Sequence, residues 1–184
     1  MRVDASLRGR LIVASPTLVD PNFRKTVVLI AEHSVEGAMG LVLNRRTPAS
    51  VADAAPHLAE LVGEDAAVFV GGPVERGTVF VLADFVEPSD AGTLVLWDVG
   101  LLVPDADPRG ASHNARQARV FAGYAGWGPG QLEDELDEEA WILADPAAED
   151  IFTDAPEQLW RRVLRRKGGQ YGVIALMPDD PRLN

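Results

Sequence analysis

Short apolar runs that are rich in β-branched residues recur along this chain, and they limit its fold more than any other feature. Each run is four to six residues long and is bounded by Gly, Pro, Asn or Asp, which is typical of strands rather than helices. The run Thr26–Ala31 is apolar at consecutive positions, which predicts a strand buried on both faces. The nine predicted strands are Arg10–Ala14, Thr26–Ala31, Gly40–Asn44, Ala67–Val70, Thr78–Ala83, Thr93–Trp97, Arg119–Tyr124, Trp141–Ala144 and Gly172–Leu176.

Two segments predict helices. Ala49–Val62 suits one or two short helices separated at Pro56, because proline lacks a backbone donor and disfavours helix in the residue before it. Ala155–Lys167 is the stronger prediction, with Asp154 as its N-cap and Gly168 as its stop. The apolar face of this helix comprises Leu159, Trp160, Val163 and Leu164.

The order of these elements points to an α+β fold. The predicted strands stand in adjacent groups rather than in strict alternation with helices, which argues against a doubly wound fold. A chain of 184 residues suits one core, so we expect a single compact domain with a mixed β-sheet over residues 1–184. Pro104–Asn114 is the predicted exposed loop because it is rich in Pro, Asp, Gly and Ser.

Composition excludes several classes of function. The net charge of −11 disfavours indiscriminate binding to nucleic acid or anionic membranes, although residues 133–154 hold ten acids and no Arg or Lys while residues 1–50 are basic on balance. The absence of cysteine removes disulfides, thiolate nucleophiles and cysteine-based metal sites. The run Leu11–Ala14 is too short for a signal-peptide core, and no run approaches the roughly 20 apolar residues of a membrane span. We expect a cytoplasmic protein that does not bind membranes.

The segment GYAGWGPGQLEDEL, residues 123–136, breaks at a proline and then becomes acidic. Its Gly-Pro-Gly predicts a strand-to-helix turn with Pro129 in the first helical turn, and the acids that follow satisfy the helix dipole and would repel phosphate. Leu132 and Leu136 are expected to pack inward at i, i+4. Tyr124 and Trp127 either close an edge of the core or form a pocket where glycine lets a ligand approach the backbone.

No recognisable catalytic or cofactor set stands out. The histidines, His33, His57 and His113, have neither the spacing nor the cysteines of a zinc site, so we predict no metal. A triad of Ser15, His33 and a distant aspartate can be drawn on paper, but Ser15 lacks the G-x-S-x-G elbow. The Gly-Gly-Pro at residues 71–73 lacks the spacing of a nucleotide-binding loop and predicts a tight turn. We therefore expect no cofactor and favour a protein without enzymatic activity.

Basic side chains gather near the ends of two predicted strands. Asn44, Arg45 and Arg46 end one buried run, and Arg24 and Lys25 precede another. These groups would bind an anion if they converged, although solvated charges that discourage pairing between sheets are the simpler explanation.

The end of the second predicted helix carries the densest positive charge. The residues are Arg161, Arg162, Arg165, Arg166 and Lys167. They would neutralise phosphates of DNA, yet no aromatic or amide side chain that reads bases lies among them. The favoured alternative is that they complement the helix dipole and meet the acidic 133–154 segment.

Five ordered blocks give the chain a family resemblance. They are Gly9–Pro16 (GRLIVASP), Asp20–Val28 (DPNFRKTVV), Gly37–Arg45 (GAMGLVLNR), Phe69–Val74 (FVGGPV) and Gly123–Leu136. Over about residues 7–176 the sequence resembles the YqgE/AlgH family. The resemblance implies a compact α+β domain whose mixed sheet curls toward a barrel with flanking helices. One branch of that family carries a transcriptional-regulator label without a recognisable DNA-binding motif, and the segment Gly100–Gln117 departs from the family's pattern.

Three functional hypotheses follow. The first, favoured by the resemblance and by the missing catalytic set, is a regulatory or binding protein without enzymatic activity, with DNA binding through the basic helix as its sharpest form. The second is a small-molecule-binding protein or enzyme. The third is a domain that docks a protein partner on the acidic 133–154 surface. The pocket residues of the second hypothesis are Arg24, Asn44, Arg45, Tyr124 and Trp127.

Overall fold

The computed structural model describes residues 6–102 and 106–178. The strands are β1 (Leu11–Ala14), β2 (Val27–Ser34), β3 (Gly37–Val42), β4 (Arg46–Ser50), β5 (Ala67–Val70), β6 (Val74–Phe85), β7 (Thr93–Leu96), β8 (Val99–Leu101), β9 (Ala115–Trp127) and β10 (Trp141–Ala144). The helices are α1 (Val51–Ala54), α2 (Ala59–Val62), α3 (Pro108–Asn114), α4 (Gln131–Asp137), α5 (Ala148–Ile151), α6 (Pro156–Lys167) and α7 (Gly169–Ile174), with short 3-10 turns η1 (Pro56–Leu58) and η2 (Pro88–Asp90).

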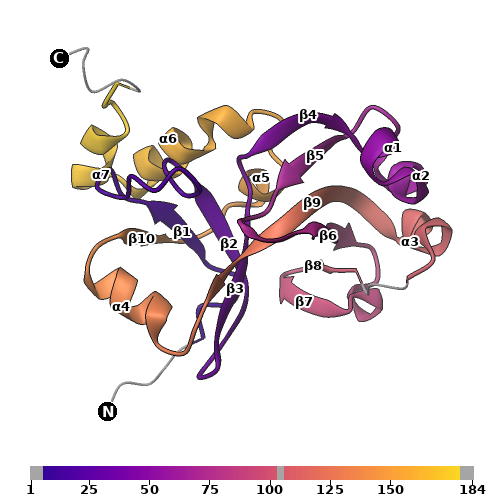
Figure 1. The fold of residues 1–184 in the computed structure, drawn as a ribbon, viewed down its shortest axis with the longest axis horizontal. Helices are drawn as coiled ribbons and strands as arrows, with labels where there is room; N and C mark the ends of the chain where they lie inside the picture. The colour runs from indigo at the N-terminus through magenta and orange to yellow at the C-terminus, as the bar shows by residue number, and fades with distance from the viewer. Residues whose placement is uncertain (1–5, 103–105, 179–184) are drawn as a thin grey trace.

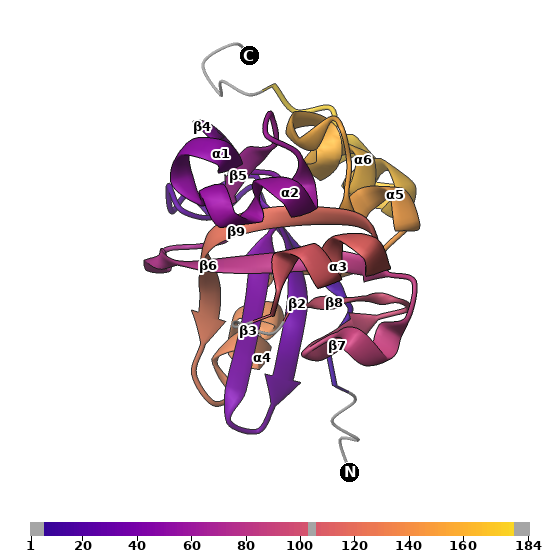
Figure 2. The ribbon, with the colours of Figure 1, turned by 90° about the vertical axis from the view of Figure 1, so that its right-hand side faces the viewer.

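The strands form one large sheet in a single α+β domain (Figure 1). Its order is β10-β1-β2-β3-β9-β6-β8-β7, and the β4-β5 pair joins it beside β9. The pairing of β5 with β9 is parallel and the other pairings are antiparallel, so the sheet is mixed as predicted. The sheet curls but stays open, with α4 and α6 flanking one half and α1, α2 and α3 the other (Figures 1 and 2). Within the described ranges no helix is both long and apolar enough to cross a membrane.

β9 is the strand on which the sheet turns. Its first half pairs with β5 and β6, whereas its last residues, Ala125–Trp127, pair with β3. Gly123 lies between the two halves with a φ of 71°, a left-handed conformation that glycine adopts without strain. Figure 2 shows β9 crossing the molecule beside β6 and then bending toward α4. One strand therefore belongs to both halves of the sheet.

Gly71 and Gly72 follow β5 and pass directly against this bend. A Cβ on Gly71 would lie 2.2 Å from the carbonyl oxygen of Gly123, and a Cβ on Gly72 would lie 2.1 Å from the carbonyl carbon and oxygen of Tyr124. The backbone N–H of Gly71 donates to the carbonyl oxygen of Ala122 at 2.9 Å. The Gly-Gly-Pro segment is therefore a close contact between two backbones, which explains its composition without a nucleotide.

The core covers both faces of β1 and β2. Alternate residues of β1 belong to two hydrophobic clusters, one that includes α6 and one that includes α4. Val27–Ala31 have no exposed surface, which confirms the prediction of a strand buried on both sides. Trp160 fixes α6 to the sheet, because its buried Nε1 donates to the carbonyl oxygen of Ala14 at 2.9 Å.

Eight of the nine predicted strands are present, and two of them, β5 and β10, have the predicted bounds. The prediction of a strand at Gly172–Leu176 is wrong, because most of this run lies in α7. Tyr171, Ile174 and Ala175 pack on the core at helical spacing, which a short apolar run does not reveal. The sequence also missed β4, which is largely exposed, and β8, which has three residues.

The helix predictions hold except at their ends. Ala49–Val62 forms α1, η1 and α2, with the break at Pro56 as expected. α6 ends at Gly168 as predicted, but its N-cap is Ala155 rather than Asp154, because Pro156 occupies the first helical position, where a missing N–H costs nothing.

Two further predictions differ from the structure. The predicted loop Pro104–Asn114 contains α3, which begins after Asp107, whose side chain accepts from the N–H of Arg109. Pro104 itself lies outside the described residues. α4 begins at Gln131 with Gly130 as its N-cap, so Pro129 is in the turn rather than in the first helical turn.

We expect Gly72→Ala to destabilise the protein by about 3 kcal/mol or more, because the new methyl group would overlap the backbone of β9. The matched control is Gly77→Ala, at a position where a Cβ meets nothing within 4 Å. Chemical denaturation of both variants measures the difference. Equal stabilities would contradict the importance of this contact.

Candidate functional site

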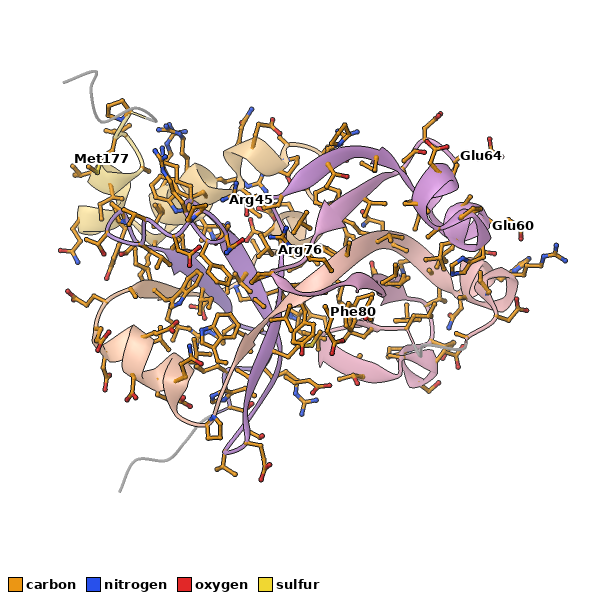
Figure 3. All side chains as sticks on the ribbon, in the orientation of Figure 1. Arg45, Glu60, Glu64, Arg76, Phe80 and Met177 are labelled. Carbon is orange, nitrogen blue, oxygen red and sulfur yellow. The ribbon has the colours of Figure 1, made fainter. Side chains whose placement is uncertain are left out.

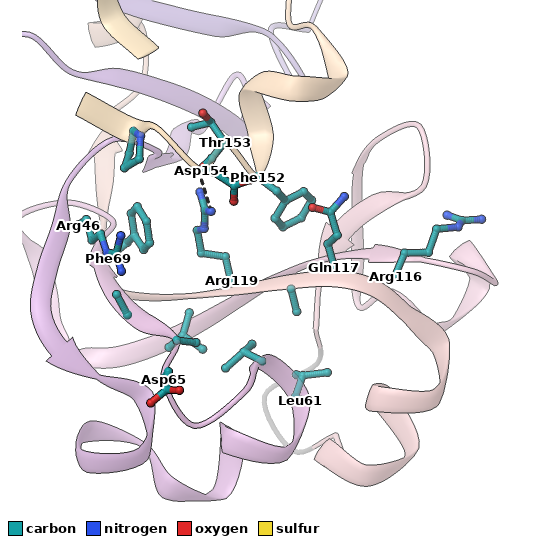
Figure 4. A pocket seen from close by; sticks show the side chains of 16 residues that line it. Arg46, Leu61, Asp65, Phe69, Arg116, Gln117, Arg119, Phe152, Thr153 and Asp154 are labelled. Atoms are coloured by element: carbon teal, nitrogen blue, oxygen red, sulfur yellow. Dashed lines mark hydrogen bonds between the residues drawn. The ribbon is translucent and has the colours of Figure 1, made fainter. Parts of the chain in front are cut away.

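A cavity of about 400 Å³ lies along β9, where α2 and the segment between α5 and α6 approach the strand (Figure 4). β9 pairs with β5 at Val120–Ala122, whereas residues 116–120 of β9 line the cavity. It therefore lies largely beyond the end of the β5 pairing. The remaining walls come from Arg46, Leu61, Val62, residues 65–67, Phe69, residues 152–154 and Pro156.

Arg119 is the central polar group of this cavity. Its Nη2 donates to the carbonyl oxygen of Thr153 at 2.9 Å, drawn as a dashed line in Figure 4. Its guanidinium carbon lies 4.4 Å from the centroid of the Phe69 ring, in cation–π geometry. Its Nη1 is buried and has no hydrogen-bond partner among the described residues. A buried, unpaired donor on a cationic group is costly, so the site is one acceptor short.

The charges around Arg119 set its electrostatics. Burial lowers the pKa of the Arg119 guanidinium from its ordinary value, the carboxylate of Asp154 opposes this shift, and repulsion by Arg46 adds to it. The group still remains charged at neutral pH, since arginine is deprotonated only under strongly basic conditions. Arg119 is thus a desolvated cation that an incoming negative charge would stabilise.

Arg116, which also lines this cavity, already forms ion pairs within the protein. It donates to Asp84 at 2.8 Å and lies 3.3 Å from Asp98. Its hydrogen bond to Asp84 raises the pKa of Arg116. Arg46 and Arg119 are therefore the cavity arginines that can still bind an anion. The exposed carboxylates of Asp65 and Asp154 line the same cavity.

Tyr124 and Trp127, two of the predicted pocket residues, lie together elsewhere. They line a groove of about 790 Å³ together with the β2–β3 hairpin and Phe80, which is labelled in Figure 3. The rings of Tyr124 and Phe80 meet edge to face, with centroids 5.7 Å apart. Trp127 is 7% exposed, so most of the indole is core rather than groove surface.

Asn44 and Arg45, also predicted for that pocket, instead hold the loop between β1 and β2. The Asn44 side chain accepts from the N–H of Val27 and donates to the carbonyl oxygen of Lys25, both at 2.9 Å. Arg45 Nη2 donates to the carbonyl oxygen of Arg24 at 2.6 Å. Arg45 also borders a separate 200 Å³ hollow with Arg46 and Arg76. The structure therefore does not bring the five predicted residues into one cavity.

The acidic helix α4 is tied to the core through two of its carboxylates. Oε2 of Glu135 accepts from the indole N–H groups of Trp127 and Trp141, both at 2.8 Å. Glu133 lies 2.7 Å from Nε2 of His33, whose Nδ1 accepts from the backbone N–H of Leu7 at 3.1 Å. The motif GYAGWGPGQLEDEL thus positions a strand, a turn and a helix.

Four of the five cations at the end of α6 have partners within the described residues. Arg166 binds the fully buried Asp150 with Nη1 at 3.1 Å and Nη2 at 2.5 Å, and Arg162 lies 3.5 Å from the same carboxylate. Arg161 donates to the carbonyl oxygen of Ala175 at 2.8 Å. Lys167 donates to that of Leu143 at 2.7 Å. This is the expected meeting of the basic helix with the acidic segment, and it leaves Arg165 as an exposed cation of the set.

The triad that can be drawn from sequence is not assembled. Ser15 Oγ shares a hydrogen bond with Thr17 at 2.6 Å, and the two ring nitrogens of His33 are taken by Leu7 and Glu133. Among the described residues no group of three or more His, Asp or Glu side chains is arranged to hold a metal ion.

Sequence reasoning missed Arg119. It stands at the start of a predicted apolar strand, and a charged residue inside a buried strand must find a partner or a ligand. That signal was present in the order Ala118-Arg119-Val120, but only the fold shows that the cavity forms here.

The geometry defines a class: a single α+β domain built on one open, mixed sheet, with an arginine-lined cavity along its bent strand. The chain belongs to the AlgH-like family, DUF179, whose model matches residues 11–172. The YqgE/AlgH resemblance is therefore confirmed.

Relatives cover nearly the whole chain. A UPF0301 protein of Streptomyces coelicolor is 45% identical over 98% of this chain and 96% of its own length. A UPF0301 protein of Chlorobaculum tepidum is 38% identical over 96% of this chain and 95% of its own. These names state no activity.

Two solved structures share the fold. Protein DIP2367 from Corynebacterium diphtheriae matches with a TM-score of 0.85 at 25% identity, covering 96% of this chain and 95% of that chain. The AlgH protein from Pseudomonas aeruginosa matches with a TM-score of 0.70 at 27% identity, covering 98% of both.

We expect Glu135→Ala to lower the free energy of unfolding by about 2 to 4 kcal/mol, because two largely buried indole N–H groups lose their acceptor. Glu135→Gln keeps an acceptor oxygen and should recover part of the loss. Glu138→Ala, at an exposed position just after the same helix, is the control. Tryptophan fluorescence during denaturation reports the result, and a loss no larger than the control's would refute this role.

Proposed function

We propose that the protein is a binding protein without enzymatic activity that takes up a small anionic molecule in the Arg119 cavity. The observation that carries the proposal is the buried Nη1 of Arg119, a residue that lines the cavity, because this atom lacks a hydrogen-bond partner within the described residues. An anion placed there would supply the missing acceptor and offset the desolvation of the guanidinium.

The lining of the cavity supports binding rather than chemistry. Its polar side chains, within the described residues, are arginines, aspartates, one glutamine and one threonine, with no histidine, lysine or serine that would act as base or nucleophile. Occupancy by a ligand would stabilise the folded state, which gives a route to regulation. The regulatory role and the cytoplasmic location remain parts of this proposal.

This site is favoured over the other hypotheses by its unmet hydrogen bond. The cations proposed for DNA are largely engaged by Asp150 and by backbone carbonyl oxygens. Acids proposed for partner docking, Glu133 and Glu135, are bound to His33 and to the two indoles. The buried Nε of Arg162 on the basic helix also lacks a hydrogen bond, but it lies 3.5 Å from the carboxylate of the fully buried Asp150, which compensates its charge.

Thermal unfolding in the presence of two anions, benzoate and phenyl phosphate, tests the proposal. At least one of them should raise the melting temperature of the protein at millimolar concentration and fixed ionic strength, because a ligand of the folded state stabilises it. The neutral analogue benzamide should have a smaller effect. Arg119→Gln should abolish the response to the anion.

Arg165→Gln makes the same charge change at an exposed site on α6 and should leave the response intact. If Arg119→Gln does not fold, Arg46→Gln tests the exposed wall of the cavity instead. No stabilisation by either anion, or equal stabilisation of the wild type and a folded Arg119→Gln, would overturn the proposed function.

A further inference from the structure

We infer that the ligand of the Arg119 cavity is a monoanionic carboxylate with a compact apolar or aromatic body. This inference rests on the proposed function and adds the ligand's charge, head group and body. Three features of the cavity support it: its balance of charge, the unpartnered Nη1 of Arg119 and its apolar wall.

The balance of charge disfavours a ligand with two negative charges. Three arginines and two aspartates line the cavity. Arg116 is paired with Asp84 and Asp98, which leaves two arginines against the carboxylates of Asp65 and Asp154. A dianion would meet repulsion from both exposed aspartates, whereas a single charge at Arg119 is compensated by a desolvated cation.

The contacts of Arg119 fix the size of the head group. Nη2 is used by the carbonyl oxygen of Thr153, and one face of the guanidinium lies over Phe69. Of the two Nη atoms, Nη1 is the one without an acceptor, and a single nitrogen suits one oxygen of a small head group such as a carboxylate. A phosphate dianion is usually held by several cations or by a cradle of backbone N–H groups, so it requires more donors than a carboxylate does.

The apolar wall fixes the rest of the ligand. Figure 4 shows the ring of Phe152 beside Gln117, on the other side of Arg119 from Phe69. Leu61, Val62 and Pro156 extend the apolar lining. A cavity of about 400 Å³ is at the small end of ligand sites, so the body is compact.

The test compares dissociation constants of benzoate, acetate, phenyl phosphate and benzamide, measured by titration calorimetry or by chemical shifts in NMR spectra. Benzoate should bind most tightly, and acetate about tenfold or more weaker because it lacks the ring. Phe152→Ala should weaken benzoate but not acetate. Arg119→Lys keeps the charge and should still weaken benzoate, because it loses the planar fork and the stacking on Phe69.

Neutralising the two aspartates of the cavity should shift its preference toward the dianion, and this shift is the sharpest test. In the double variant Asp65→Asn, Asp154→Asn the affinity for phenyl phosphate should rise about threefold to tenfold more than that for benzoate, because a dianion gains more from each removed carboxylate. Both positions are exposed, so the variant is expected to fold.

The outcomes separate the inference from the proposed function. Tighter binding of phenyl phosphate than of benzoate by the wild-type protein, with dependence on Arg119, would overturn the monocarboxylate but keep an anion site. Binding of benzamide equal to benzoate would overturn the inferred charged head group. Absence of binding by either anion would overturn both proposals.

Discussion

The contact of two glycine backbones with the bend of β9 is the constraint on which the rest of the structure depends. Gly71 and Gly72 approach Gly123 and Tyr124 so closely that no side chain fits between them. This approach lets β9 leave the β5-β6 half of the sheet and join β3. The bend also delivers Trp127 to the start of α4 and leaves residues 116–119 of β9 beside the Arg119 cavity. The shape of the sheet and the place of the cavity therefore have one origin.

Buried and half-buried polar side chains then hold the elements that the glycines position. Asn44 holds the loop before β2 with one donor and one acceptor, Glu135 ties α4 to two tryptophans, and Asp150 joins α5 to α6. Each of these groups lies between elements that the hydrophobic core alone would orient loosely. The motifs that make the sequence recognisable thus serve mainly to set the geometry of loops and helices, and Tyr124 is an exception because it faces a groove.

The sequence predicted the fold class, most strands and α6, because buried strands and an amphipathic helix leave periodic or continuous apolar patterns. It failed at Gly172–Leu176, where a short apolar run fits either a strand or a helix, and at β4, whose residues are mostly exposed. The candidate site was harder to predict. Asn44 and Arg45 belong to a recognisable motif, but their side chains bind carbonyl oxygens of the loop before β2, and this arrangement depends on how β2 and β3 pair. The cavity itself exists only because α5 and α6 return to β9.

The energetics of Arg119 support the proposed ligand of the cavity. A methionine or leucine at this position would fill space beside Phe69 without a desolvation cost, and such replacements of buried charges are often neutral or stabilising. The native residue instead keeps a cation whose pKa is lowered by burial and whose Nη1 has no partner within the described chain. Stacking on Phe69 and one bond to Thr153 offset part of this cost. In the proposed function, an acceptor that enters the cavity recovers the remainder.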